Sequence, residues 1–371
     1  MRPLRICVIA SSRFPIAEPY AGGLEAHTAA LVVELRARGH DVDLFAAPGS
    51  SPALGARELP VAPFASSPAA RADLAAPPET WMREHHAYLD LMLGLHRGAG
   101  DRGGRGTYDV VHNNSLHHLP VAMASTVPAP VVTTLHTPPI PWLESAVGLS
   151  RATNTHFIAV SDATRVQWAP LVDAEVVHNG VDTDAWVLGP GGDRAVWSGR
   201  LVPEKAPHAA VLAARAAGIP LDLIGPVGDP EYVATQVLPL LDDPGDPHAD
   251  YRHLGHLTRA ALARAVGSAA VAVLTPAWEE PFGLVAAEAM SCGTPVAAYA
   301  RGALPEIVDA DTGRLAEPDD VAGLAAAMRD ATRLDRVGVR TSAVKRFGLT
   351  AMVDAYEDLY RRAVHSLGQA A

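Results

Sequence analysis

The chain has 371 residues, of which 49% are hydrophobic and 19% are charged. This composition excludes a disordered chain and is sufficient for two folded domains. The formal net charge of −11 disfavours binding to nucleic acid and to anionic lipid, so any phosphate site must be a local cationic pocket in an acidic protein.

The first half alternates short β-branched runs with alanine- and leucine-rich stretches, which predicts an α/β fold with a parallel sheet. The predicted strands are residues 4–10, 42–45, 110–112, 131–134, 157–160 and 175–178. A helix is predicted from about Gly23 to Arg38, because its leucines and valines recur on one face and Gly39 provides a stop.

The middle of the chain is less regular. Residues 48–78 are rich in proline, alanine and serine and predict a long surface excursion. A helix is predicted over residues 80–97, followed by a glycine- and arginine-rich loop over residues 98–106. Residues 182–193 hold three aspartates, three glycines and one proline, which is typical of a linker between domains.

A second alternating set then follows, so we expect a second parallel sheet. Its predicted strands are residues 195–198, 221–224, 251–254, 270–274 and 296–299. We therefore expect an amino-terminal domain over residues 1–182 and a carboxy-terminal domain over residues 183–350. The amphipathic last helix must bury its apolar face, and we expect the segment 351–371 to pack back on the first domain.

The cysteine count and the hydropathy pattern bear on location. There are two cysteines, Cys7 and Cys292, and nothing suggests a disulfide framework, which fits a reducing compartment. The first apolar run is too short for a secretory signal, and no run reaches the length of a membrane span. We therefore expect a cytoplasmic protein.

The segment of residues 278–290 is the most informative for chemistry. A helix is predicted to begin at about Gly283, where its N–H groups and those of Leu284 would form an anion site. Glu288 lies one turn later on the same face, and a carboxylate among small apolar neighbours needs hydrogen-bond donors such as a ribose diol. Glu280 can reach the sugar side of the same ligand. Alternatively, Glu288 pairs with an arginine and Glu280 is a solvated turn residue.

A second candidate element follows the predicted strand 195–198. Gly199 lets the backbone approach a ligand, Arg200 offers a planar fork of donors and Lys205 offers a point charge. Together the two cations would neutralise a diphosphate leaving group. The alternative is a basic turn paired with Glu204.

Two further elements follow strands of the first half. Gly22 and Gly23 would expose backbone donors to an anion, although many such turns use glycine only for packing. The dinucleotide fingerprint Gly-x-Gly-x-x-Gly is absent. His136 ends a predicted strand before a proline-rich loop, which suits a sugar-hydroxyl contact or a proton carrier. Because the chain has 16 histidines, a purely structural His136 is the competing interpretation.

The sequence gives no sign of a bound metal or cofactor. His85, His86, His117 and His118 occur as adjacent pairs, and adjacent residues do not face one way on a helix, so they make poor metal chelates. No Asp-x-Asp element ends a predicted strand to hold a cation under a diphosphate. We therefore expect neither a metal nor a cofactor.

In this order, the elements resemble the retaining glycosyltransferases of family 4, which have the GT-B fold. That fold has two Rossmann-like domains whose parallel sheets face each other across an interdomain cleft. The matching pieces run through nearly the whole chain, and residues 48–106 match nothing in the family pattern. The pieces are Gly22-Gly23, 38–42, 158–161, 178–182, Gly199-Arg200 with Lys205, Glu280 to Glu288, and 293–296.

The resemblance implies a role for each matching residue. The implied contacts of the donor diphosphate are Arg200, Lys205, Gly22, Gly23, Gly283 and Leu284. The implied contacts of the transferred sugar are Glu280, Phe282, Gly283 and His136, with Glu280 and His136 as catalytic candidates. Glu288 would hold the ribose, the first domain would bind the acceptor, and transfer would be metal-independent with retention at the anomeric carbon.

Other functions compete with this hypothesis. The missing dinucleotide fingerprint argues against a nicotinamide-dependent oxidoreductase. The retained acidic and basic residues argue against a catalytically silent sugar-nucleotide-binding protein, and phosphate-dependent cleavage would reveal a sugar phosphorylase. The acidic charge and the lack of a basic amphipathic helix disfavour an acceptor on a membrane surface. We expect a small soluble acceptor, such as a natural product or a sugar phosphate, or else a glycan.

Overall fold

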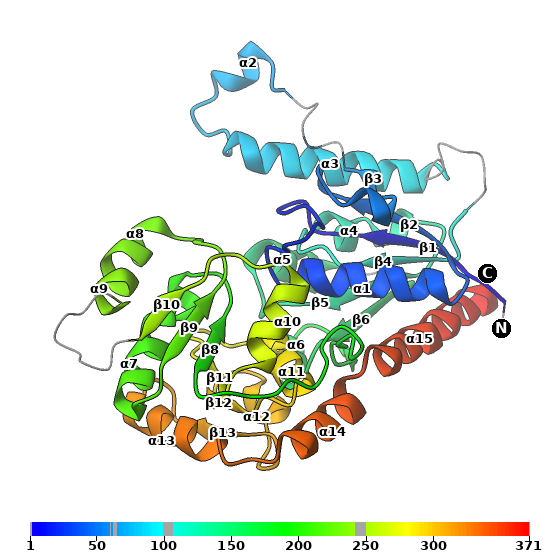
Figure 1. Cartoon of the computed structure of the whole chain (residues 1–371). Coiled ribbons are helices and arrows are strands. Elements are labelled where there is room, and N and C mark those ends of the chain that lie inside the picture. Colours follow the sequence, from blue (N-terminus) through cyan, green and yellow to red (C-terminus); the bar gives the residue numbers. More distant parts are fainter. Residues whose placement is uncertain are drawn as a thin grey trace.

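The computed structural model describes residues 2–59, 61, 65–98, 107–150, 152–241 and 250–370. Its two parallel sheets belong to two domains that lie against each other (Figure 1). The predicted α/β fold with two parallel sheets is confirmed. The predicted loop over residues 98–106 lies outside the described residues, apart from Gly98.

The first sheet has seven strands in the order β3-β2-β1-β4-β5-β6-β7, all paired in parallel. Its strands are β1 (Arg5–Ile9), β2 (Asp41–Ala46), β3 (Arg57–Glu58), β4 (Val110–Asn113), β5 (Val131–Leu135), β6 (Thr155–Ala159) and β7 (Glu175–Val176).

The second sheet has six strands in the order β10-β9-β8-β11-β12-β13, again all parallel. Its strands are β8 (Ala195–Ser198), β9 (Leu221–Ile224), β10 (Tyr251–His253), β11 (Val271–Leu274), β12 (Val296–Tyr299) and β13 (Gly313–Ala316). In each sheet the first strand lies in the interior, and later strands are added on both sides of it. This reversal of strand order opens a crevice at the carboxyl ends of the central strands.

Helices cover the sheets. In the first half they are α1 (Gly23–Ala37), α2 (Pro68–Arg71), α3 (Glu79–His96), α4 (Leu119–Ala122), α5 (Pro141–Leu149) and α6 (Asp162–Trp168). In the second half they are α7 (Pro207–Ala217), α8 (Pro230–Tyr232), α9 (Leu238–Leu241), α10 (Arg259–Gly267), α11 (Leu284–Ser291), α12 (Leu304–Ile307), α13 (Val321–Ala331), α14 (Arg336–Phe347) and α15 (Leu349–Ala370). Short 3-10 turns occur at Pro52–Leu54, Ala124–Thr126 and Pro203–Lys205, and Val233–Val237 forms a π-helical turn.

Alternation along the strands divides each core into two layers. In β1, Ile6 and Val8 face a cluster shared with α1 and α15, whereas Cys7 and Ile9 face a cluster shared with α3. The second sheet is likewise covered by α11 and α14 on one face and by α7 and α13 on the other. Burial on both faces explains the continuous apolar runs that the sequence shows for these strands.

The chain crosses between the domains twice, and the two crossings lie side by side. Val181 and Gly348 form an isolated parallel bridge, in which the Val181 N–H donates to the Phe347 carbonyl over 2.7 Å. Beyond this point α15 packs against α1 and the first sheet, with Val353, Tyr356 and Tyr360 buried there. The last helix thus belongs to the core of the first domain although it follows the second in sequence.

Two strands escaped prediction from the sequence. β3 has only two residues, and β13 is Gly-Arg-Leu-Ala, with no β-branched side chain to mark it. β13 is a strand because it pairs with β12 along four residues. The excursion of residues 48–78 contains β3, α2 and one 3-10 turn in the residues that the structure describes.

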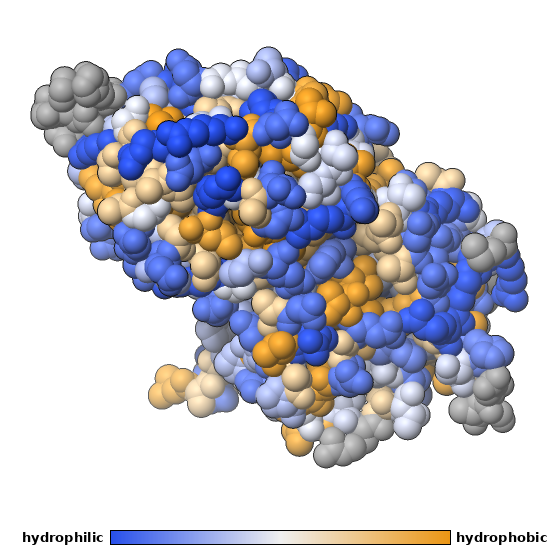
Figure 2. All heavy atoms as spheres, turned by 90° about the horizontal axis from the view of Figure 1, so that it is seen from below, coloured by the Kyte–Doolittle hydropathy of each residue, from blue (hydrophilic) through white to orange (hydrophobic). Residues whose placement is uncertain are grey.

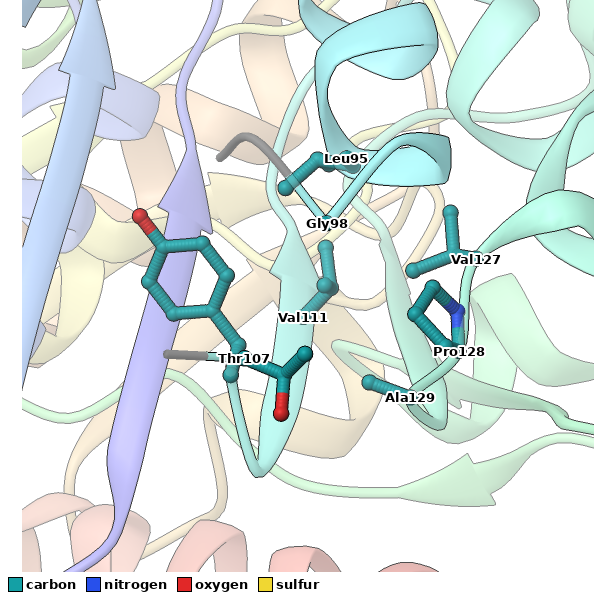
Figure 3. Close-up of a pocket in the computed structure, with 8 residues that line it drawn as sticks. Leu95, Gly98, Thr107, Val111, Val127, Pro128 and Ala129 are labelled. Atoms are coloured by element: carbon teal, nitrogen blue, oxygen red, sulfur yellow. The ribbon is translucent and has the colours of Figure 1, made fainter. Parts of the chain in front are cut away.

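No described helix is both long and apolar enough to cross a membrane. Seen from below, separate apolar patches lie among hydrophilic residues (Figure 2). A small cavity of about 10 Å³ beside α3 and β4, lined by residues such as Leu95 and Val111, has room for about one water (Figure 3).

Candidate active site

A cleft with a volume of about 380 Å³ lies between the two domains. Its first-domain wall includes the start of α1 and His136 after β5, and its second-domain wall includes Arg200 after β8 and the start of α11. These groups lie at the carboxyl ends of strands, next to the points where strand order reverses. The cleft therefore occupies the position in which parallel α/β sheets bind ligands.

All ten residues predicted for the site line this cleft. Three of them come from the first domain and seven from the second, so the second domain supplies most of the site. They are Gly22, Gly23, His136, Arg200, Lys205, Glu280, Phe282, Gly283, Leu284 and Glu288.

Gly283 sets the geometry at the start of α11. It adopts a left-handed conformation, with φ of 84°, and a Cβ atom there would lie 2.8 Å from Cδ2 of Leu304. Both the backbone angle and the lack of space therefore require glycine. The turn brings the first N–H groups of an eight-residue helix to the cleft, where the helix dipole favours an anion.

Glu288 is a half-buried acid one turn further along α11. Burial raises its pKa from 4.5 to about 8, and the nearby Arg259 charge offsets only part of that rise. Among the described residues, the Glu288 carboxylate has no hydrogen bond or ion pair. In the described residues Glu288 is thus not paired with an arginine, which was the alternative interpretation. The nearby Arg259 pairs with Glu18 and Asp182.

Lys205 and Glu280 form an ion pair across the second-domain wall. The Lys205 Nζ atom lies 2.5 Å from Oε2 of Glu280 and 5.1 Å from the ring centroid of Trp278. No local pattern in the sequence predicts this pair, because 75 positions separate its members. A cation and an acid side by side can bind a phosphate oxygen and a sugar hydroxyl of one ligand.

Arg200 reaches across the cleft. Its guanidinium carbon lies 5.9 Å from the ring centroid of Phe14 in the first domain. Its Nη2 atom lies 4.0 Å from Oε1 of Glu204. At that distance and with both side chains partly exposed, the pair with Glu204 contributes little. Arg200 is therefore available to a ligand.

The start of α1 is crowded. A Cβ atom on Gly23 would lie 3.4 Å from Cδ2 of Leu284, which is van der Waals contact, so the starts of α1 and α11 lie against each other here. A Cβ atom on Gly22 would lie 3.3 Å from Oε2 of Glu25, which lines the cleft and is 5% exposed. Burial raises the pKa of Glu25, while its own backbone N–H and the Arg200 charge favour the ionised form.

His136 is held by a partner from the next strand. Its Nε2 atom lies 2.8 Å from Oδ1 of Asn114, and the ring of His27 stands edge-on at 5.0 Å. Burial, with smaller contributions from His27 and His112, keeps the pKa of His136 well below its usual range. The ring is therefore neutral, and with Nε2 donating to Asn114 its Nδ1 lone pair can accept a hydrogen bond.

Sequence reasoning missed Glu25 and Asn114. Glu25 lies in the first turn of α1, three residues after Gly22, where acids commonly cap helices. Asn114 directly follows β4, and a polar residue at a strand end is the same signal that singled out His136.

The histidine pairs proved closer in space than their sequence positions suggested. Potential ligand atoms of His85, His117 and His118 lie within 4.8 Å of one another. However, Nδ1 of His117 already accepts from the Leu119 N–H, and the rings of His117 and His118 stack at 4.3 Å. Stacked rings point their in-plane lone pairs side by side rather than at one centre, so this arrangement does not favour a metal.

Comparison with known families identifies this architecture. Residues 21–185 match the model described as Glycosyltransferase Family 4, and residues 189–342 match the model described as Glycosyl transferases group 1. The chain belongs to glycosyltransferase family 4. The two matches meet in the stretch that connects the two sheets. The second match contains all six strands of the second sheet, and the first match contains β2 to β7 of the first sheet, whereas β1 precedes it.

This glycosyltransferase has relatives of known sequence and structure. It is 29% identical to the glycogen synthase of Mycobacterium tuberculosis over 302 residues, covering 72% of this chain and 70% of that one. It is also 29% identical to the D-inositol 3-phosphate glycosyltransferase of Mycolicibacterium smegmatis over 411 residues, covering 98% and 92%. Its fold is similar to that of Anabaena HepE, solved in complex with UDP and glucose, with a TM-score of 0.72, 19% identity and coverage of 96% and 99%. The GT-B fold is thereby confirmed.

Proposed function

We propose that this glycosyltransferase moves a sugar from a nucleoside diphosphate donor to a hydroxyl of a small acceptor, with retention at the anomeric carbon and without a metal. The carrying observation is that Arg200, Lys205, the start of α11 and a Glu288 without a partner among the described residues all line one cleft. The cleft thus brings cations and a helix start together with an acid, in a protein whose net charge is −11. It suits a diphosphate next to a ribose.

The two domains divide the work in this proposal. Residues 183–350 bind the donor, and residues 1–182 with α15 present the acceptor. The adjacent crossings at Val181 and Gly348 are the natural hinge, because they join the domains at one place. Closure about this hinge would expel water that would otherwise hydrolyse the donor.

The chemistry follows from the charges. As the bond between the anomeric carbon and the diphosphate breaks, Arg200, Lys205 and the α11 dipole stabilise the charge that develops on the leaving group. The acceptor oxygen bonds to the anomeric carbon from the same face, and its proton passes to the departing diphosphate. Glu280, engaged by Lys205, contacts a sugar hydroxyl rather than acting as a nucleophile, and Nδ1 of His136 accepts from another hydroxyl.

Other features agree with this proposal. HepE, which shares the fold, was solved with UDP and glucose, so UDP-glucose is the first donor to test. Cys7 and Cys292 are both buried and unpaired, which supports a reducing location such as the cytoplasm.

A thermal-shift panel of UDP, GDP, ADP and dTDP with their glucose conjugates tests donor binding. A ligand present at about 100 times its Kd should stabilise the fold by about 2.7 kcal/mol. Initial rates of transfer with and without EDTA then test the metal, and the anomeric coupling constant of the product tests retention. If no nucleotide stabilises the protein, the proposal is wrong. Binding without turnover on any donor would instead indicate a catalytically silent binding protein.

A further inference from the structure

Six rings gather in the first domain, beside the cleft. They come from α3, from the segment after β4 and from the start of α5. We call them the ring cluster, and they are Trp81, His85, Tyr88, His117, His118 and Trp142.

Contacts within the ring cluster fix most of its members. Trp81 stacks on His85 with centroids 5.3 Å apart and lies nearly parallel to His118 at 6.4 Å. His117 stacks between Tyr88, at 4.4 Å, and His118, at 4.3 Å. Trp142 lies at the edge, with its ring 5.6 Å from both Trp81 and His118. The result is a preformed aromatic surface.

The ring cluster continues the first-domain wall of the cleft. Leu116, which lines the cleft, directly precedes His117 in the chain. The hydroxyl of Tyr88 accepts from the Ser12 N–H over 2.9 Å, and the neighbouring Ser11 also lines the cleft. The ring cluster therefore lies next to residues of the first-domain wall, although the six rings themselves are outside the cleft lining.

Exposure and charge indicate what the ring cluster binds. Trp142 is 61% exposed, which is unusual for the largest apolar side chain and leaves ring surface uncovered. Two of the histidines, His117 and His118, are neutral, since burial lowers the pKa of His117 to about 3 and also lowers that of His118. The rings thus offer flat, uncharged faces. Arg13, the cation that acts on His117, lines the cleft itself.

We propose that the ring cluster is the acceptor subsite of this enzyme and binds an uncharged acceptor that carries a ring, either a sugar or an aryl group, stacked on Trp142. The inference rests on the proposed function and narrows its acceptor, because the ring cluster supplies a face for stacking, whereas the nearby cation Arg13 lines the cleft. Stacking on an aromatic face and exclusion of water supply the affinity.

Saturation-transfer NMR with p-nitrophenyl β-D-glucoside as the probe tests this subsite in protein loaded with UDP. We expect Trp142→Ala to weaken binding roughly tenfold, as the loss of an aromatic contact predicts. Leu149→Ala is the matched control, because Leu149 is 73% exposed on the same helix but lies outside the ring cluster. Trp142→Phe, which keeps a ring, should retain most of the affinity. Melting temperatures of the three variants should equal that of the wild type.

Three results would overturn the subsite. They are equal binding by Trp142→Ala and wild type, no binding by the wild type, and a preference for glucose 6-phosphate that does not depend on Trp142. The proposed function is tested by a separate measurement, the thermal stabilisation of the protein by UDP without the glucoside. If the wild type does not bind UDP but binds the glucoside in a way that depends on Trp142, the donor proposal is wrong and the subsite proposal is supported.

Discussion

Replacing Glu288 with glutamine should change stability and donor affinity in opposite directions. The carboxyl has a pKa of about 8 in the folded protein and about 4.5 when solvated, so the folded state binds more protons between these values. Wild-type stability must therefore fall as the pH rises through this window. Glutamine carries no charge at any pH, so the variant should match the wild type near pH 4.5 and exceed it at pH 8.

The size of the effect follows from the shift and from the position of the side chain. One pKa unit corresponds to about 1.36 kcal/mol, so the full shift would amount to several kcal/mol. Glu288 is only half-buried and faces the cleft, where water solvates the charged form. We therefore expect the variant to gain about 1–2 kcal/mol at pH 8. Donor affinity should nevertheless fall about 10- to 100-fold, because hydrogen bonds to a charged group contribute about 1.5–3 kcal/mol.

Urea unfolding at pH 5 and pH 8 measures the first effect, and calorimetric titration with UDP measures the second. Glu317→Gln is the control, since Glu317 is an exposed acid outside the cleft. A variant with the same pH dependence as the wild type would refute the raised pKa of this half-buried carboxylate. A variant that binds UDP as tightly as the wild type would refute the ribose contact.

Further predictions concern the cation, the turn and the last helix. Lys205→Ala should lower kcat/KM about 10- to 100-fold through the loss of a charge-assisted contact; unchanged initial rates would show that Lys205 does not bind the diphosphate. Gly283→Ala should destabilise the protein by at least about 1 kcal/mol more than Gly218→Ala in urea unfolding, because both glycines have positive φ but only Gly283 also meets a side chain. Glu357→Gln should cost about 1–3 kcal/mol at pH 7, because Arg38 and His40 both contact this carboxylate. Those contacts lower the pKa of Glu357 below 4.5. The ionised carboxylate therefore stabilises the fold above pH 4.5, and this stabilisation should be lost as the pH falls through the lowered pKa. Thermal unfolding of the wild type and the variant at pH 3 and pH 7 would check this.

Local pattern was sufficient to predict the two sheets and the residues at their carboxyl ends. Strands such as β5 and β12 are buried on both faces, so their side chains are continuously apolar and visible in the sequence. The same logic located Arg200, Lys205, Glu280 and Glu288, because parallel strands end at a common edge and a polar residue there faces the crevice.

Tertiary structure alone decided the partners of those residues. The Lys205–Glu280 pair and the Asn114–His136 contact join segments that are distant in sequence, and no local periodicity encodes such distances. β13 is a strand only because β12 pairs with it, against its own propensity. The histidines occur in the sequence as separate adjacent pairs. In the structure they contact Trp81 and Trp142, because α3 and α5 pack beside the end of β4. Local sequence patterns do not predict how these helices pack.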